Sequence, residues 1–224
     1  MQTFIDFGTS NIDRLATALW QHVSLVLLAV GISIVLAALI TAILHRLSHN
    51  RITTPRLNRT GKKATEWVQG MLSALYSIPS LALFALAIPV LGIGPTTAVV
   101  VLVIYNQFLL VRNFTAGLDD VDTSMVEAAR SLGLNRLQTF MYVQLPLAAP
   151  VFIAGIRIAT VSTIGIATIA ATIDAGGLGT LMFTGLRTSN LPMLLWATIL
   201  AAGLALLVNV LLSQIEKIFI LKHG

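Results

Sequence analysis

The chain has 224 residues, of which 56% are hydrophobic and only 10% are charged. Soluble domains are about 25% charged, so this composition excludes a soluble globular protein and predicts an all-α integral membrane domain. The chain has no cysteine, so it can form neither a disulfide framework nor a thiolate metal site. The net charge of +5 does not indicate nucleic-acid binding, because the basic residues follow a membrane-topology pattern.

Apolar runs predict five transmembrane helices in a single domain. A run of about 20 apolar residues crosses a bilayer as a helix, because lipid offers the backbone no other hydrogen-bond partner. We expect one polytopic domain over residues 1–224, with its core at about 20–215 and with the first helix kept in the mature protein. The predicted spans are residues 23–44, 68–90, 96–110 with a continuation towards 114, 157–173 with a lead-in from 150, and 191–212.

The distribution of lysine and arginine predicts the orientation. Cytoplasmic loops contain the excess of positive charge, and here only Arg14 and Arg187 lie on the less basic side. We therefore expect the N-terminus outside the cell and the C-terminus in the cytoplasm. The basic residues on the expected cytoplasmic side are Arg46, Arg51, Arg56, Arg59, Lys62, Lys63, Arg112, Arg130, Arg136, Lys217 and Lys222.

Two prolines, Pro79 and Pro89, interrupt the second predicted span, and a tight external turn at residues 92–95 follows it. Proline frees backbone carbonyls and kinks a membrane helix. Two interpretations stay open: an irregularity of helix packing, or a hinge or irregular wall beside a transport pathway.

A polar segment at residues 119–146 predicts a short helix between the third and fourth spans. Ser124 and Glu127 have the spacing of a capping box at its start, and Asp122 is the competing cap. Gly133 is expected to end this helix, because glycine adopts the left-handed conformation of a helix C-terminus.

A second short helix is predicted to begin at Asn135–Gln138 and to end at Leu145-Pro146. Two structured helices on the cytoplasmic side favour docking with a soluble partner. An interfacial amphipathic hairpin without a partner is the alternative.

This segment matches the pattern E-A-A-x3-G-x9-[I/V]-x-L-P. It resembles the hallmark loop of permease subunits of type I binding-protein-dependent ABC importers, with valine where isoleucine is usual. In that family the loop contacts the ATPase, so the resemblance assigns ATPase coupling to it. The matching residues are Glu127, Ala128, Ala129, Gly133, Val143, Leu145 and Pro146.

Further segments between residues 66 and 215 resemble the branch of that family that imports glycine betaine, choline, carnitine and other quaternary-amine osmoprotectants. Asp174 departs from the branch, which more often has a small residue there, at the outer gate. The segments with this resemblance are residues 78–83, 92–94, 145–148, 154–157, 164–165 and 175–179.

The resemblance implies a division of labour in the inner membrane of a bacterium. This chain would be a multi-pass, non-enzymatic permease that works with a second permease, identical or homologous, a cytoplasmic ATPase dimer and an extracytoplasmic binding protein. The sequence contains no P-loop motif, so ATP and magnesium would bind to the ATPase and no cofactor to this chain.

Aromatic residues in the spans are candidates for the cargo path, because a quaternary ammonium prefers an aromatic face. The candidates are Tyr76, Phe84, Tyr105, Phe108 and Trp196, and of these Tyr76, Phe84 and Tyr105 are assigned to the path. Ordinary packing is the alternative interpretation, since most aromatic residues in spans pack against neighbouring helices.

Polar residues in the spans extend the candidate path. Asn106 and Gln107 are costly in lipid, so at least one of them should face protein or water. Thr168 and Thr172 share a face of the fourth span, which is rich in small residues and whose default role is helix packing.

Charged and imidazole groups indicate no further site. Arg157 is close enough to the inner membrane edge that we expect its side chain to reach the interface. His45 and His49 have the spacing of metal ligands on a helix but lack a third ligand, so we expect no metal site.

Three other functions are weighed against the osmoprotectant importer. An importer of another small polar solute, such as an amino acid, is the nearest. A secondary transporter or channel usually has ionisable residues mid-span, and here only the marginal Arg157 qualifies. A membrane hydrolase needs a base and a nucleophile in register, and the histidines lie at or outside the span edges.

Overall fold

The computed structural model describes residues 4–48 and 55–223, and within those residues every regular element is helical. Helix formation follows from the composition, since apolar segments in lipid must satisfy their backbone groups internally. The elements are α1 (Phe4–Ser10), α2 (Ile12–Ser48), α3 (Pro55–Tyr76), α4 (Ser80–Leu91), α5 (Pro95–Asp119), α6 (Thr123–Ser131), α7 (Arg136–Thr139), the π-helix η1 (Phe140–Gln144), α8 (Leu145–Ile169), the 3-10 helix η2 (Ala170–Ile173), α9 (Leu178–Arg187) and α10 (Leu191–His223).

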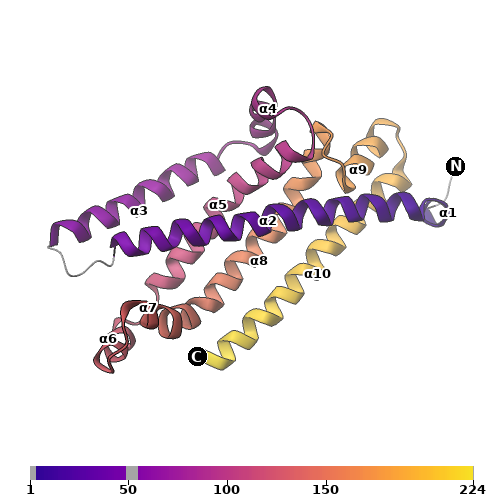
Figure 1. Ribbon diagram of the computed structural model, residues 1–224. Coiled ribbons are helices and arrows are strands. Elements are labelled where there is room, and N and C mark those ends of the chain that lie inside the picture. The colour runs from indigo at the N-terminus through magenta and orange to yellow at the C-terminus, as the bar shows by residue number, and fades with distance from the viewer. Residues whose placement is uncertain (1–3, 49–54, 224) are drawn as a thin grey trace.

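The long helices pack as a bundle in which neighbours in sequence are mostly neighbours in space (Figure 1). Helix α5 packs between α2 and α8, and α10 packs on α8. Helices α1, α4 and α9 lie towards the top and right of Figure 1, whereas α6, α7 and the C-terminus lie at the bottom. The chain therefore crosses the bundle repeatedly and ends at the opposite side from its start.

The predicted spans are found, and most helices are longer than the apolar runs that predicted them. Four helical segments are long and apolar enough to cross a membrane, and a bent pair gives a fifth crossing if it is counted as one span. Helix α2 has 37 residues and α5 has 25. Polar and charged residues at their ends continue the helix beyond the apolar run, because helix does not require apolar side chains.

The second predicted span, 68–90, is interrupted at Pro79, as the sequence indicated, whereas Pro89 lies within α4 without breaking it. The chain bends by 95° between Lys63–Tyr76 and Ser80–Leu91. Pro79 has no N–H to continue the ladder and takes an extended backbone as the N-cap of α4. The hydroxyl of Tyr105 donates to the carbonyl of Ile78 at this break. The neighbouring helix thus supplies the hydrogen bond that the interrupted helix lacks.

A polar cluster joins three helices in the middle of the bundle. Asn106 of α5 donates to Ser33 Oγ of α2 at 3.3 Å and accepts from Thr163 Oγ1 of α8 at 2.9 Å. Gln107 donates to the carbonyl of Ser33 at 3.4 Å. Both amides face protein, which confirms the expectation from their cost in lipid.

Close contacts hold α5 against α8 just before and just after the polar segment. A Cβ on Gly155 would lie 2.6 Å from Asn113 Cβ, and a Cβ on Gly117 would lie 3.0 Å from Val151 Cβ. Distances under 3 Å are forbidden to real Cβ atoms, so only glycine permits the approach at Gly155. At these two glycines, α5 and α8 are therefore in close contact, with the backbone of one helix against side chains of the other.

A short helix that the sequence did not predict, α9, lies at the end of the bundle opposite α6 (Figure 1). Gly177 lies where a Cβ would be 3.0 Å from His22 Nδ1, and a Cβ on Gly179 would collide with the carbonyl of Thr168. Gln21 Oε1 accepts from the N–H of Gly177 at 3.1 Å. Asp174 precedes this turn with a left-handed backbone, φ 57°, a conformation that Asp tolerates better than most residues.

The two ends of the bundle lead to a topology prediction. A reporter fused after His223 should lie in the cytoplasm, and a reporter inserted within residues 184–190 should lie outside the cell. The two positions are at opposite ends of the bundle, and the basic residues favour the cytoplasmic side. Paired phosphatase and fluorescent-protein fusions measure the two positions in the same cells. Two reporters on one side of the membrane would contradict the five-span topology.

Gly155→Ala should destabilise the protein by about 1–3 kcal/mol, the usual cost of overpacking a filled contact. The added methyl must displace Asn113, whose Cβ cannot move without α5. Thermal unfolding of the purified protein in detergent measures the effect. Gly203→Ala on α10 is the control, because nothing lies within 4 Å of its Cβ position and alanine favours helix there. Equal melting temperatures for the two variants would refute the close contact.

Candidate functional site

The polar segment between α5 and α8 begins with a well-capped helix, α6. Asp122, rather than the predicted Ser124–Glu127 capping box, is the cap: its Oδ1 accepts from the N–H of Ser124 at 2.8 Å. Asp122 was the alternative candidate for the N-cap. Helix α6 begins at Thr123, so Asp122 occupies the N-cap position. The same hydrogen bond lowers the pKa of the Asp122 carboxyl below its usual value.

Helix α6 ends at Ser131, and Gly133 reverses the chain just after it, as predicted. Gly133 has φ +89°, and the N–H of Leu134 donates to Ala129 at 3.2 Å while that of Gly133 donates to Arg130 at 3.0 Å. These paired bonds are a Schellman motif, in which the left-handed residue reverses the chain. Nothing lies within 4 Å of a Cβ position on Gly133, so the requirement for glycine is one of backbone conformation.

The second short helix begins as predicted but does not end as predicted. Asn135 and Gln138 form a reciprocal capping box, with both bonds at 2.9 Å. Leu145-Pro146 does not terminate the helix, because a π-turn precedes it and the N–H of Leu145 donates to the carbonyl of Phe140. The wide turn lets α7 run through η1 into α8, and Pro146 lies in the first turn of α8, where it needs no donor.

The predicted coupling residues lie at different depths. Glu127, Ala128 and Gly133 are exposed, whereas Ala129 is only 6% exposed. Leu145 and Pro146 are half-buried at the start of α8. Helix α6 thus presents one small, polar face outward while Ala129 holds it against the rest of the segment. A capped helix with an exposed small-residue face is suited to enter a cleft in another protein.

Exposed apolar side chains surround this face. Leu132 is 82% exposed and Tyr142 is 73% exposed. Both lie in the polar segment rather than along a lipid-facing span. Exposed apolar side chains gathered at one end of a molecule are typical of an interaction surface.

Arg157 forms an ion pair, and the expectation that its side chain reaches the membrane interface stays a prediction. Its Nε lies 3.1 Å from Glu216 Oε2, and its guanidinium also donates to Asn209 Oδ1 at 3.1 Å. Sequence reasoning missed Glu216 because it lies beyond the predicted end of the fifth span, and helix α10 extends past it. The ion pair ties α8 to the C-terminal helix near the same end as α6.

The aromatic candidates gather at the break between α3 and α4. Tyr76 and Tyr105 meet edge to face with ring centroids 5.6 Å apart, and Tyr76 also lies 4.8 Å from Phe108. Tyr76 is half-buried, but Tyr105 is only 5% exposed and Phe84 is fully buried in the same apolar core. Of the three, Tyr76 is the one with accessible surface in this chain.

The polar candidates for the cargo path differ in how far they are buried. Asn106 is 2% exposed and committed to the bonds with Ser33 and Thr163 described above. Thr168 is half-buried and Thr172 is exposed, and each hydroxyl donates to the carbonyl three residues earlier, at Gly165 and Ile169 respectively. Their roles in a cargo path stay predictions.

No group of three potential metal ligands occurs within residues 4–48 and 55–223. His45 lies in α2 beside Phe140, with ring centroids 5.9 Å apart. His49 lies outside the described residues.

Comparisons with known proteins agree on one family. The profile of the binding-protein-dependent transport system inner membrane component matches residues 56–222. The chain is 34% identical to the osmoprotectant import permease protein OsmW of Salmonella typhimurium over 96% of this chain and 95% of that protein. It is 33% identical to the carnitine transport permease protein OpuCB of Listeria monocytogenes, over 96% and 93%.

A solved structure shares the fold. The chain in an inward-facing structure of the MetNI methionine ABC transporter superposes with a TM-score of 0.79 at 20% identity, covering 94% of this chain and 98% of that one. At that identity the similarity establishes the fold alone. The helical bundle, the multi-pass apolar spans and the family match together show that this chain belongs to the binding-protein-dependent transport system inner membrane components, as an ABC importer permease of the inner membrane.

Proposed function

We propose that this permease imports a quaternary-amine osmoprotectant and takes its driving force from an ATPase that docks on α6. The observation that carries the proposal is the α6–α7 segment: it is rigidly capped at both ends of α6 and exposes Glu127 and Ala128. A separate ATPase dimer would bind ATP and magnesium, because this sequence has no P-loop.

Motion at α6 has a direct route to the membrane helices. Helix α5 ends four residues before α6 begins, and the following α7, η1 and α8 form one continuous helical path. The contacts at Gly117 and Gly155 leave α5 and α8 no room to slide independently. A partner that tilts α6 would therefore move α5 and α8 as a pair, which is how closure of an ATPase dimer becomes opening of a path.

The cargo assignment rests on the relatives and on the chemistry of the spans. The two relatives described above are named as osmoprotectant and carnitine permeases. A permanently methylated cation cannot be neutralised by proton transfer, so its path should be uncharged and partly aromatic. The half-buried Tyr76, seated at the α3–α4 break with Phe108, is the best-placed aromatic for such a path. A delivering binding protein and a second permease copy or homologue complete the proposed importer.

Gly133→Val should reduce uptake and ATPase copurification severalfold while the protein still inserts in the membrane. A β-branched residue at φ +89° costs about 1–3 kcal/mol and reshapes the turn that orients α6. Membrane fractionation, pull-down of the tagged permease and transport assays measure the three properties in one strain.

The matched control for that variant is Gly92→Val. Gly92 has φ +81° and open space around its Cβ position, so it bears the same backbone strain at the opposite end of the bundle. Gly92→Val should retain the ATPase. Equal loss of the ATPase in both variants would mean that strain alone, and not the α6 turn, explains the result.

Uptake measurements test the cargo. Cells grown at high osmolarity with and without this gene are given labelled glycine betaine, carnitine and choline. We expect loss of the gene to remove uptake of at least one of the three and a plasmid copy to restore it. If uptake of all three is unchanged and uptake of an amino acid is lost instead, the chain is an importer of another solute class.

A further inference from the structure

A pocket of about 570 Å³ lies at the end of the bundle opposite α6, where α2, the start of α5 and the turn before α9 meet. This volume is within the range of about 300–1,000 Å³ that is usual for small-molecule sites. Part of the wall is apolar: Leu25 and Leu28 come from α2, and Val99 comes from α5. The pocket therefore has room for a small organic molecule.

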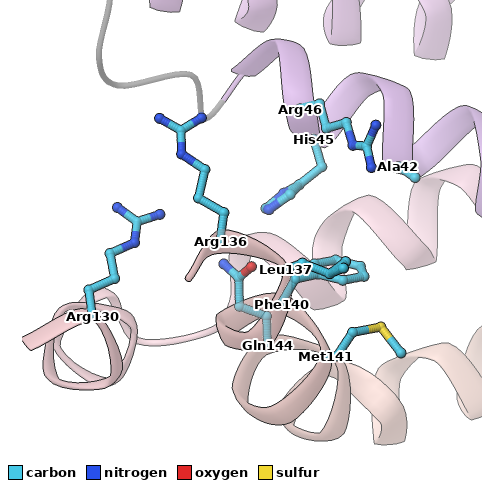
Figure 2. Close-up of a pocket in the computed structure, with 9 residues that line it drawn as sticks. All are labelled: Ala42, His45, Arg46, Arg130, Arg136, Leu137, Phe140, Met141 and Gln144. Carbon is cyan, nitrogen blue, oxygen red and sulfur yellow. The ribbon is translucent and has the colours of Figure 1, made fainter. Parts of the chain in front are cut away.

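Asp174 gives the pocket its charge. Within residues 4–48 and 55–223, it is the only lining residue with a charged side chain, and its carboxylate has no hydrogen-bond or ion-pair partner there. By contrast, the lining of the pocket beside α6 and α7 includes Arg46, Arg130 and Arg136 (Figure 2). Of these two pockets, the one with Asp174 is suited to a cation.

The backbone at Asp174 is left-handed, with φ 57°. This conformation costs free energy for a residue with a side chain, and it occurs preferentially at functional sites. The structure tolerates the cost because hydrogen bonds fix the turn on both sides. The N–H of Ala175 donates to the carbonyl of Ala170 at 3.2 Å, and the N–H of Gly177 donates to Gln21 Oε1 at 3.1 Å. The turn thus holds Asp174 in place before any ligand binds, which lowers the cost of binding.

The lining distinguishes between kinds of cation. A calcium or magnesium ion takes about six or more oxygen ligands, and a primary ammonium has three N–H donors and is strongly hydrated. A methylated ammonium has no N–H donor. Its permanent charge is attracted to a carboxylate, and its methyl groups gain from contact with aliphatic side chains. One carboxylate beside an aliphatic wall therefore fits a methylated ammonium best.

We propose that this pocket binds the methylated ammonium group of a small solute on the extracytoplasmic side, with Asp174 as its counter-charge. The orientation of this end and the identity of the solute as cargo rest on the proposed function. A site here would hold the cargo between its release by the binding protein and the opening of the path. Binding to the pocket itself can be measured without transport.

The test uses the full-length permease with the subunits that copurify with it, in phosphatidylglycerol nanodiscs without the binding protein. Saturation-transfer NMR measures the affinities for choline and for 3,3-dimethyl-1-butanol, which has carbon in place of the charged nitrogen. The wild-type protein should bind choline about fivefold more tightly, the effect of one charge pair in a water-exposed site. Asp174→Asn should remove this difference, and asparagine also tolerates the left-handed backbone.

Two controls accompany the variant. Asp13→Asn removes an exposed carboxylate of α2 that does not line this pocket, and it should leave the preference for choline unchanged. Nanodiscs that contain phosphatidylcholine offer the same methylated ammonium as a lipid headgroup. Choline should bind equally well in these nanodiscs if the pocket takes a free solute.

Three outcomes would overturn the inference. Equal affinity of the wild-type protein for choline and the neutral alcohol would show that the charge is not recognised. Equal loss of the preference in Asp174→Asn and Asp13→Asn would show a diffuse charge effect. Loss of choline binding in phosphatidylcholine nanodiscs would assign the pocket to a lipid headgroup.

Failure of this inference can be told apart from failure of the proposed function. If uptake depends on this gene but Asp174→Asn binds choline as the wild type does, the importer function stands and the pocket assignment fails. If choline binds through Asp174 but uptake of all three solutes is independent of the gene, the pocket stands and the cargo assignment fails.

Discussion

Lipid supplies no hydrogen-bond partners, and this constraint governs where the chain departs from regular helix. At the α3–α4 break, the Tyr105 hydroxyl satisfies the carbonyl of Ile78. At the entry to α8, the π-turn supplies a bond from Leu145 to Phe140 before Pro146 removes a donor. In the first place a hydroxyl from a neighbouring helix completes the interrupted backbone, and in the second the π-turn keeps the backbone hydrogen bond within the helix itself.

The same constraint links the membrane core to the coupling segment. Burying the polar side chain of Asn106 in the bundle costs free energy, which its hydrogen bonds to Ser33 and Thr163 offset. Those bonds join α2, α5 and α8 at one level, and the glycine contacts join α5 to α8 nearer the α6 end. A helix bundle fixed at two levels transmits a tilt better than one held by apolar contacts alone, because directional bonds resist sliding. The polar cluster therefore stiffens the bundle, and the role of Asn106 in a cargo path stays a prediction.

Sequence reasoning succeeded where one residue type determines local geometry. Gly133 predicted its own left-handed turn, and Asn135 with Gln138 predicted a helix start, because both signals act within a few residues. It failed where a distant partner decides. The continuous helix through Pro146 depends on a π-turn, and the ion pair of Arg157 depends on a carboxylate 59 residues later. The aromatic candidates were also separable only in three dimensions, since burial distinguishes Tyr76 from Phe84 and their sequence contexts are alike.

The charges near the α6 end follow a single physical rule. Arg157 and Glu216 are only partly exposed, and they are paired, because an unpaired charge away from water is costly. Arg46, Arg130 and Arg136 are exposed, so water lowers the free-energy cost of their charges. The ion pair between Arg157 and Glu216 fixes α8 to α10 within the protein.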